Sequence, residues 1–205
     1  MNTRTIGGWA LLVNAFLTLI LLITMSTSSG GDTLSTSIGE ALSLSLIVGL
    51  VAIWTMQRHV GRPGQMGLIG VWCLGIATGI AFVVRLAVLV GPIDVVDLIP
   101  FSSAVFGLVG SLLLGWATIR AAVFHPIIGW LLILGGVLNF VGGLFLAGSG
   151  QTLVGMIAAL AQAGALGGYG WTILRHANTD APASIGDGVY PHPAPTGGMS
   201  RLMDK

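Results

Sequence analysis

Charged residues are scarce in this chain. Of its 205 residues only 7% are charged, whereas 54% are hydrophobic. An ordinary soluble domain carries roughly 25% charged residues, so the chain has too few charges to cover a water-facing surface. Its formal net charge of +1 also excludes a nucleic-acid-binding protein that relies on bulk positive charge, because such binding depends on neutralising phosphates.

Cysteine is almost absent as well. Cys73 is the single cysteine, which excludes a disulfide scaffold and a cysteine-rich metal site. Glycine is abundant at 32 residues, but it follows no G-X-Y period, so a collagen-like chain is excluded. The composition that remains is that of a multi-pass integral membrane protein.

Six windows of the sequence are long and apolar enough to cross a bilayer, whose core of about 30 Å needs ~20 apolar residues per helix. These windows are residues 6–25, 38–56, 66–90, 101–124, 126–147 and 152–174. Strand-like alternation is absent, and lipid does not tolerate open sheet edges. The predicted fold class is therefore all-α, an integral membrane bundle of six transmembrane helices within a domain of residues 1–176.

The composition changes at the C-terminal end. Residues 177–205 are rich in Pro and Gly and poor in large apolar side chains. Such a segment cannot bury enough apolar surface to order itself, so we predict a disordered cytoplasmic tail.

The basic residues predict the orientation in the membrane. Seven of the eight Lys and Arg residues fall on one side of the predicted bundle. They are Arg4, Arg58, Arg62, Arg120, Arg175, Arg201 and Lys205. The positive-inside rule places that side, with both termini, in the cytoplasm. The opposite side carries acidic residues, namely Asp32, Glu40, Asp94 and Asp97.

Tryptophan marks an internal repeat. Each predicted span carries one tryptophan near its cytoplasmic end, and these are Trp9, Trp54, Trp72, Trp116, Trp130 and Trp171. Each even-numbered span also has an arginine four residues after its tryptophan, namely Arg58, Arg120 and Arg175. We interpret this pattern as three copies of one helical hairpin in the same orientation.

The spacing of these residues suggests how they meet the membrane. Residues four apart share a helix face, so each indole is expected at headgroup level with the arginine reaching toward water and phosphate. The favoured interpretation is an aromatic belt at the cytoplasmic interface. The alternative is a ring of three arginines that binds an anionic lipid or a phosphate, with three histidines nearby, His59, His125 and His176.

Two charged residues lie inside predicted spans. Arg85 is the one basic residue away from the cytoplasmic side, and Glu40 lies at nearly the same depth on the preceding span. A charge at the bilayer centre costs ~2.5–3.5 kcal/mol on insertion scales and therefore needs a partner. We predict an Arg85–Glu40 ion pair, with Asp94 or Asp97 as the competing partner. Its role can be structural or functional.

Uncharged polar and small residues also occur within the spans. Asn139 and Gln162 lie at matched depth in one hairpin, which predicts an amide–amide hydrogen bond, and Asn14 adds polarity to the first span. These amides are either interhelical glue or the lining of a polar path. Small residues at four-residue spacing predict close helix packing. They are Gly75 and Gly79 in the third span, Ser103, Gly107, Ser111 and Gly115 in the fourth, and Gly155, Ala159, Ala163 and Gly167 in the sixth.

Several chemistries have no residues to support them. The histidines lie at the predicted cytoplasmic boundary or in the tail, so a haem site within the spans is excluded. The only lysine is Lys205, which excludes a retinal Schiff base. No metalloprotease motif or catalytic constellation occurs within the spans. The sequence therefore predicts no enzyme, no cofactor and no metal site.

The segment that joins the fourth and fifth spans has a sequence that can be compared with a known signature. Residues 115–126 read Gly-Trp-Ala-Thr-Ile-Arg-Ala-Ala-Val-Phe-His-Pro and continue with Ile-Ile-Gly-Trp-Leu-Leu. This stretch resembles a signature of uncharacterised bacterial membrane proteins with six transmembrane helices. The resemblance covers residues 4–176 and implies a six-helix fold in the bacterial cytoplasmic membrane. It implies no catalytic residue.

Two functions fit these observations. The favoured one is a non-enzymatic structural, accessory or lipid-interacting protein, whose partners are the bilayer and either a second copy or another membrane protein. The alternative is a small transporter or channel whose path is lined by Arg85, Glu40, Asn139 and Gln162. The two differ in geometry, because a transporter needs a water-accessible cavity that reaches those residues.

Overall fold

The computed structural model describes residues 3–27, 32–58, 61–90, 98–145 and 149–178. Every regular element in these ranges is an α-helix, which confirms the all-α class. The helices are α1 (Thr3–Thr27), α2 (Asp32–Gln57), α3 (Gly61–Val90), α4 (Leu98–Ala121), α5 (Pro126–Phe145) and α6 (Ser149–Asn178). Most of the tail predicted to be disordered lies outside the described residues, but α6 continues to Asn178.

Five of the six helices are long and apolar enough to cross a membrane. Their apolar parts are Thr3–Thr24, Gly64–Val84, Phe101–Ala121, Pro126–Gly143 and Leu153–Ala177. In α2 the apolar part within the described residues is shorter, Ala41–Gln57. An apolar helical bundle of this kind is compatible with a multi-pass membrane protein.

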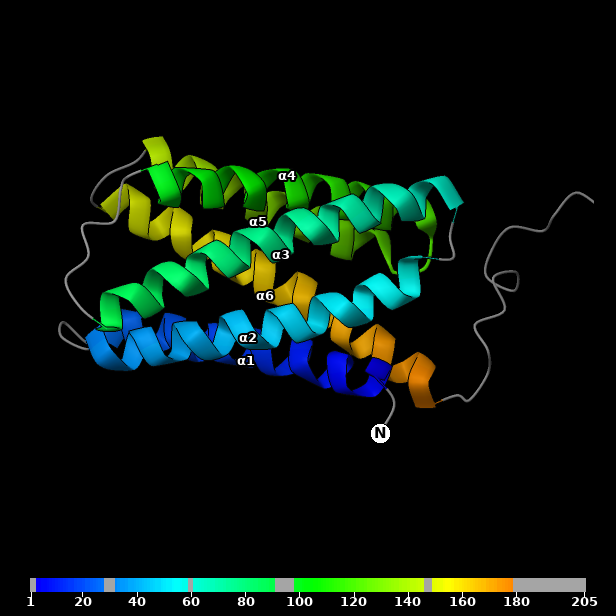
Figure 1. Cartoon of the computed structure of the whole chain (residues 1–205), viewed down its shortest axis with the longest axis horizontal. Helices are drawn as coiled ribbons and strands as arrows, with labels where there is room; N and C mark the ends of the chain where they lie inside the picture. The colour runs from blue at the N-terminus through cyan, green and yellow to red at the C-terminus, as the bar shows by residue number, and fades with distance from the viewer. Residues whose placement is uncertain (1–2, 28–31, 59–60, 91–97, 146–148, 179–205) are drawn as a thin grey trace, which may run out of the picture.

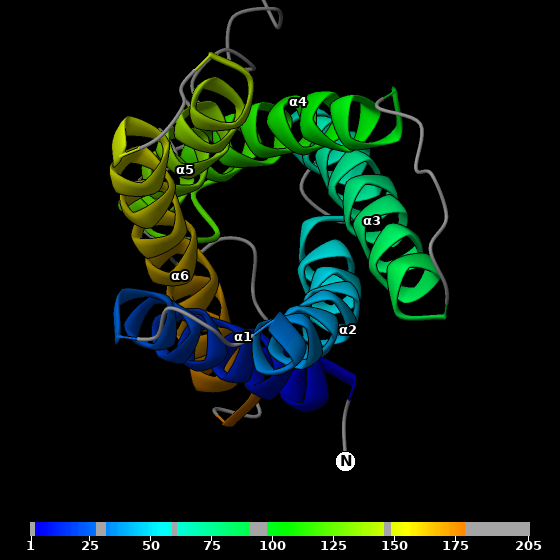
Figure 2. The same ribbon diagram turned by 90° about the vertical axis from the view of Figure 1, so that its left-hand side faces the viewer.

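The helices form a ring that closes on itself. Each helix packs against the next along the chain, and α6 packs against α1. Figure 1 shows successive helices running in opposite directions along the horizontal axis, and Figure 2 shows the ring viewed along that axis. All six tryptophans consequently lie toward one end of the ring, where α1, α3 and α5 begin. We call it the tryptophan end.

The outer surface of the ring is apolar. Phe145 is 74% exposed, Trp72 67% and Phe16 63%, and each of the six helices carries exposed Leu, Ile, Val, Phe or Trp side chains. A water-soluble protein rarely exposes apolar patches beyond a few hundred Å², whereas hydrocarbon tails cover such a surface at no cost. The exposed faces are therefore those expected of helices that contact lipid.

Glycines let neighbouring helix backbones approach closely. A Cβ atom at Gly70 of α3 would lie 2.5 Å from the backbone nitrogen of Leu114 and 3.0 Å from the carbonyl oxygen of Gly110 in α4. A Cβ atom at Gly170 of α6 would lie 2.7 Å from the carbonyl oxygen of Gly8 in α1. Contacts of this kind replace the hydrophobic driving force that lipid removes, and the second one closes the ring.

Only some of the glycines expected to pack from their spacing do so. A Cβ atom at Gly115 of α4 would lie 2.7 Å from the carbonyl oxygen of Gly129 in α5, which confirms close packing there. A Cβ atom at Gly75, Gly79 or Gly155 would meet nothing within 4 Å. The expectation of close packing at Gly75, Gly79 and Gly155 is therefore wrong. Four-residue spacing is present at those sites, but the face of α3 that meets α4 is the one that carries Gly70.

The connection between α4 and α5 is short and turns one side chain inward. Helix α4 ends at Ala121, whereas the predicted span continued to Phe124. Ala122 has a φ of 53°, a left-handed conformation that terminates helices. Phe124 is then buried. His125 precedes α5, where its Nδ1 accepts a hydrogen bond from the backbone N–H of Ile127 at 3.3 Å, as a helix-capping residue does.

We predict that the substitution Gly70→Ala destabilises the bundle by about 1–3 kcal/mol, because the added methyl group overpacks the α3–α4 contact. The matched control is Gly75→Ala on the same helix. It should leave stability unchanged or raise it slightly, since alanine is the better helix former by up to about 1 kcal/mol. Thermal unfolding in detergent, followed by circular dichroism, measures both. Equal midpoints for the two variants would contradict the assignment of Gly70 to the contact.

Candidate functional site

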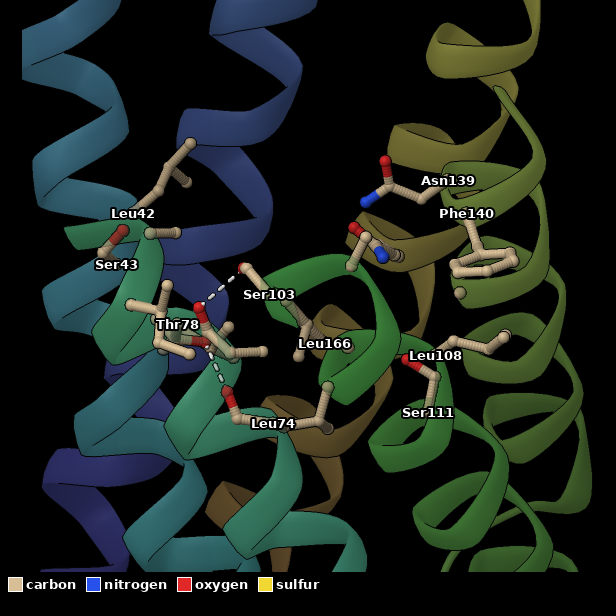
Figure 3. A pocket seen from close by; sticks show the side chains of 18 of the residues that line it. Leu42, Ser43, Leu74, Thr78, Ser103, Leu108, Ser111, Asn139, Phe140 and Leu166 are labelled. Carbon is tan, nitrogen blue, oxygen red and sulfur yellow. Dashed lines mark hydrogen bonds between the residues drawn. The ribbon is translucent and has the colours of Figure 1, made fainter. Parts of the chain in front are cut away.

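A cavity of about 520 Å³ lies inside the ring, and all six helices contribute to its wall. It occupies the half of the bundle away from the tryptophan end and is only partly enclosed. Its polar lining residues are Asn14, Thr18, Ser43, Thr78, Ser103, Ser111, Asn139 and Gln162. None of the lining residues within the described part of the chain is charged. Figure 3 shows the side chains of Thr78, Ser103 and Asn139 around this space.

Most of the polar side chains in the wall donate hydrogen bonds to backbone carbonyls. Thr78 donates to the carbonyl oxygen of Leu74 at 2.7 Å within α3, and Ser103 donates from α4 to that of Ala77 at 3.0 Å; both bonds are drawn in Figure 3. Thr18 donates to the carbonyl oxygen of Asn14 at 2.9 Å. These bonds satisfy the hydroxyl protons without a side-chain partner in the cavity.

Asn14 joins two helices. Its Nδ2 donates to the carbonyl oxygen of Leu42 at 2.6 Å and to the Oγ of Ser45 at 2.8 Å. The side chain is buried and connects α1 to α2. Asn14 therefore acts as interhelical glue, one of the two roles predicted for it, and it also lines the cavity.

Asn139 and Gln162 both lie on the cavity wall, on α5 and α6. The hydrogen bond predicted between their amides is not formed, and within the described ranges neither side chain has a hydrogen-bond partner. Gln162 instead packs against Gly135, where a Cβ atom would lie 2.6 Å from its Cγ. Both amides are thus available to a molecule in the cavity.

The cavity ends on a tier of apolar side chains. Leu46, Leu74 and Leu166 line it and also pack in the buried apolar core. Beyond them, toward the tryptophan end, the core contains Leu11, Leu50, Leu114 and Leu132. We call these seven leucines the leucine tier. It lies between the cavity and the tryptophan end of the ring.

Beyond the leucine tier lies a buried polar cluster of Gln57, Thr118 and Tyr169, all fully buried. It continues the inner faces that line the cavity. On α4, Ser111, Leu114 and Thr118 follow one another at spacings of three and four residues, and on α6 the corresponding series is Gln162, Leu166 and Tyr169. Residues at these spacings share a helix face, so cavity, leucine tier and polar cluster are stacked along the ring.

Thr118 is the centre of the polar cluster. Its Oγ1 donates to the carbonyl oxygen of Leu114 at 2.8 Å, which uses its only proton. The hydroxyl of Tyr169, 2.6 Å away, therefore donates to Thr118. The Tyr169 ring also meets the ring of Phe124 edge-on, with centroids 4.8 Å apart. The α4–α5 connection thus contributes to closing this end of the ring.

The side-chain amide of Gln57 lacks a partner for one of its hydrogen-bonding groups. Its Nε2 donates weakly to Thr118 at 3.4 Å, but its Oε1 is buried without a hydrogen-bond partner. It faces Gly67, where an added Cβ atom would overlap Oε1. A buried acceptor without a partner costs about 1–3 kcal/mol. An arrangement of this cost is not expected in a purely structural bundle, where an apolar residue would serve better.

The tryptophan end presents the residues of the predicted belt. Trp9, Trp54, Trp72, Trp116, Trp130 and Trp171 are all exposed. The guanidinium of Arg120 lies 4.8 Å from the ring centroid of Trp116, and that of Arg58 lies 5.7 Å from that of Trp54. Arg175 is exposed at the corresponding position of α6. The cation–π contacts that the i, i+4 spacing favours are therefore present in two hairpins.

The structure does not describe the side chains of the predicted Arg85–Glu40 pair. The two positions belong to α3 and α2, which are neighbours in the ring, but their side chains lie outside the described residues, as do Asp94 and Asp97. Among the side chains that the structure describes, no group of three His, Cys, Asp or Glu residues is placed to hold a metal ion.

Comparisons of the chain with protein-family models, curated proteins and solved structures find no match. Function therefore has to be inferred from the geometry of the cavity and the polar cluster.

The polar cluster is not predicted from the sequence. Gln57 lies one residue beyond the predicted second span, 38–56, although it is the last residue of α2. Tyr169 lies inside the predicted sixth span, 152–174, among glycines at 167, 168 and 170. One signal was available: Ser111 and Thr118 are seven residues apart, as are Gln162 and Tyr169, and seven residues are nearly two helical turns. Polar residues on a common face at two depths indicate a polar axis.

We predict opposite effects for two substitutions in the polar cluster. Gln57→Met should raise the free energy of unfolding by about 1 kcal/mol, because it removes a buried acceptor that has no partner. Tyr169→Phe should lower the free energy of unfolding by about 1 kcal/mol, because it removes a hydrogen bond. Gln65→Met, at an exposed position of α3, is the control and should have no effect. Thermal unfolding in detergent measures all three. A loss of stability in Gln57→Met equal to that in Tyr169→Phe would contradict this account of Gln57.

Proposed function

We propose that the chain is a six-span membrane protein that conducts or transports a small solute along the axis of its helical ring. The observation that carries this proposal is the cavity of about 520 Å³, which has polar groups from all six helices in its wall. Helical bundles with a purely structural role fill their centre with side chains at the density of a crystal. A polar hollow on the axis matches the geometry of solute pathways instead.

In this proposal the structure corresponds to a state closed at the tryptophan end. A solute enters the cavity from the opposite side, reaches Asn139 and Gln162, and stops at the leucine tier. Hydrophobic constrictions of this kind close pathways by excluding water. Passage to the tryptophan end requires the leucine side chains to separate and exposes the polar cluster, whose unpartnered Gln57 Oε1 then meets water or solute.

The proposal extends to the membrane arrangement. Helix α2 spans the bilayer together with the other five because it completes the ring between α1 and α3. The tryptophan end lies in the cytoplasm, as the basic residues indicate, and the membrane is the bacterial cytoplasmic membrane. Solute passage needs no catalytic group, so the protein is not an enzyme.

A second function is favoured by a separate observation. The Arg58–Trp54 and Arg120–Trp116 contacts hold guanidinium groups where lipid phosphates lie, as expected for an accessory or lipid-interacting protein that binds anionic lipid. Such a protein would not require a polar cavity. The two functions therefore differ in whether solute crosses the membrane when the protein is present.

The orientation is tested by cysteine labelling in a Cys73→Ser background. A cysteine at His125, which is exposed at the tryptophan end, should not react with a membrane-impermeant maleimide in intact cells. A cysteine at Gly148, in the connection between α5 and α6, should react. Permeabilised cells, in which both cysteines should be labelled, provide the control. Labelling of only the His125 cysteine in intact cells would show the inverse orientation.

Solute passage is tested with the purified protein in liposomes, by stopped-flow light scattering during an osmotic challenge with small solutes such as urea or glycerol. We expect Gly107→Leu to slow solute entry by about an order of magnitude or more, because the side chain projects into a narrow pathway. Gly107 lines the cavity, and a Cβ atom there would meet only Ala77, at 3.9 Å.

The matched control is Gly143→Leu on the exposed face of α5, where a Cβ atom meets nothing within 4 Å. It introduces the same side chain outside the cavity and should conduct like the unmodified protein. If protein-containing and protein-free liposomes swell at the same rate with every solute, the transport proposal is wrong and the lipid-interacting function is favoured.

A further inference from the structure

We infer that the cavity selects small solutes rich in N–H donors and rejects solutes without them. This inference rests on the proposed function, because it names the substrate class of the same site. It follows from which hydrogen-bonding groups in the wall already have a partner in the protein and which remain for a molecule inside the cavity.

Four of the five hydroxyl groups in the wall donate to backbone carbonyls, whereas Ser111 has no hydrogen-bond partner within the described ranges and keeps its proton for a bound molecule. Thr18, Thr78 and Ser103 each donate to a backbone carbonyl, at 2.9, 2.7 and 3.0 Å. A hydroxyl has one proton and two acceptor lone pairs. Once the proton is directed at a carbonyl, the oxygen can only accept a further hydrogen bond. These three residues therefore present acceptors to the cavity (Figure 3).

Asn14 also has its donors engaged and can only accept a further hydrogen bond. Both of its donor contacts are made by Nδ2, to the carbonyl oxygen of Leu42 and to Ser45 Oγ. An amide nitrogen has two protons, so this group has no donor left, and only Oδ1 remains as an acceptor. The wall on the side of α1, α3 and α4 thus presents mostly acceptors, and among its described residues only Ser111 keeps a side-chain donor.

The amides of Asn139 and Gln162 complete the wall on the other side. Each carries both donors and an acceptor, and neither has a hydrogen-bond partner among the described residues. A bound molecule can therefore receive hydrogen bonds from these two amides while it donates several to the acceptors opposite. A planar amide-type solute with N–H groups and one carbonyl matches this arrangement, and so does a protonated primary amine, which shares the N–H donors.

The acceptor-rich wall also disfavours anions. Oxygen lone pairs place partial negative charge toward the cavity, and the lining residues within the described ranges contribute no cation. An anion in this space would meet these acceptors and only the few donors of Asn139, Gln162 and Ser111, so its lost hydration would be replaced only in part. The shared recognition chemistry is therefore the N–H donor, whether the solute that carries it is neutral or positively charged.

The test compares small solutes with and without N–H donors in liposomes that contain the full-length protein. Urea and trimethylamine N-oxide form the neutral pair, and methylammonium and tetramethylammonium form the cationic pair; in each pair only the first has N–H donors. Formate is the anionic probe. Entry is measured by light scattering for neutral solutes and by radiolabelled uptake for charged ones.

We expect the protein to accelerate entry of urea, of methylammonium or of both, and to leave the two donor-free solutes and formate slow. Urea alone identifies neutral amides as the substrate class, and methylammonium alone identifies protonated amines. Thr78→Val and Ser103→Ala each remove one acceptor. Each should reduce the ratio of donor-rich to donor-free entry roughly fivefold, the factor that corresponds to one hydrogen bond.

The matched control is Thr172→Val. Thr172 also donates to a carbonyl four residues earlier, that of Gly168 at 2.8 Å, but it does not line the cavity, so this variant should keep the original ratio. The two cavity variants are made singly, so that one remains informative if the other fails to fold. Equal entry of donor-rich and donor-free solutes, fastest entry of formate, or an unchanged ratio in both cavity variants overturns the inference while solute passage stands. Absence of any protein-dependent entry overturns the proposed function as well.

Discussion

The structure depends on the close approach of helix backbones at glycine. At Gly70 and Gly110 between α3 and α4, and at Gly8 and Gly170 between α6 and α1, one helix lies so near the next that a single added carbon would overlap a backbone atom. These contacts tie each helix to its ring neighbours and not to a partner across the axis. Because cohesion lies between adjacent helices, the centre need not be filled, and a polar cavity coexists with a stable bundle.

The ring has different properties at its two ends. In one half the inner faces carry hydroxyl and amide groups around a cavity. In the other half the same faces meet in leucine side chains and then in the buried cluster of Gln57, Thr118 and Tyr169. The buried apolar core lies mostly in the closed half, where Phe124 from the α4–α5 connection packs against Tyr169. If solute passes along the axis as proposed, this asymmetry is that of a pathway closed at one end, and opening requires the leucine tier to separate.

The sequence predicts the helices well because apolar windows of ~20 residues and the absence of charge leave one secondary structure in lipid. It also identifies Asn139 and Gln162 as residues of interest, because depth can be counted along a helix. It does not predict which face of each helix points inward. The helices are apolar on most sides, so their rotation is set by local contacts such as Gly70 against Leu114, and the spacing of Gly75 and Gly79 is misleading. For the same reason the polar cluster was missed, since its three residues belong to three helices and meet only after the ring closes.

The contact between α1 and α6 has a consequence for biosynthesis. The first and last helices of the chain are neighbours in the ring, so the ring has a side open to lipid until the sixth helix has left the ribosome. During that interval the inner face of α1, with Asn14, borders the gap that α6 later fills with Gln162. The nascent five-helix chain therefore exposes amide and hydroxyl groups that hydrocarbon solvates poorly. Contact between the first and last helices is therefore the step that closes the ring and separates these polar groups from lipid.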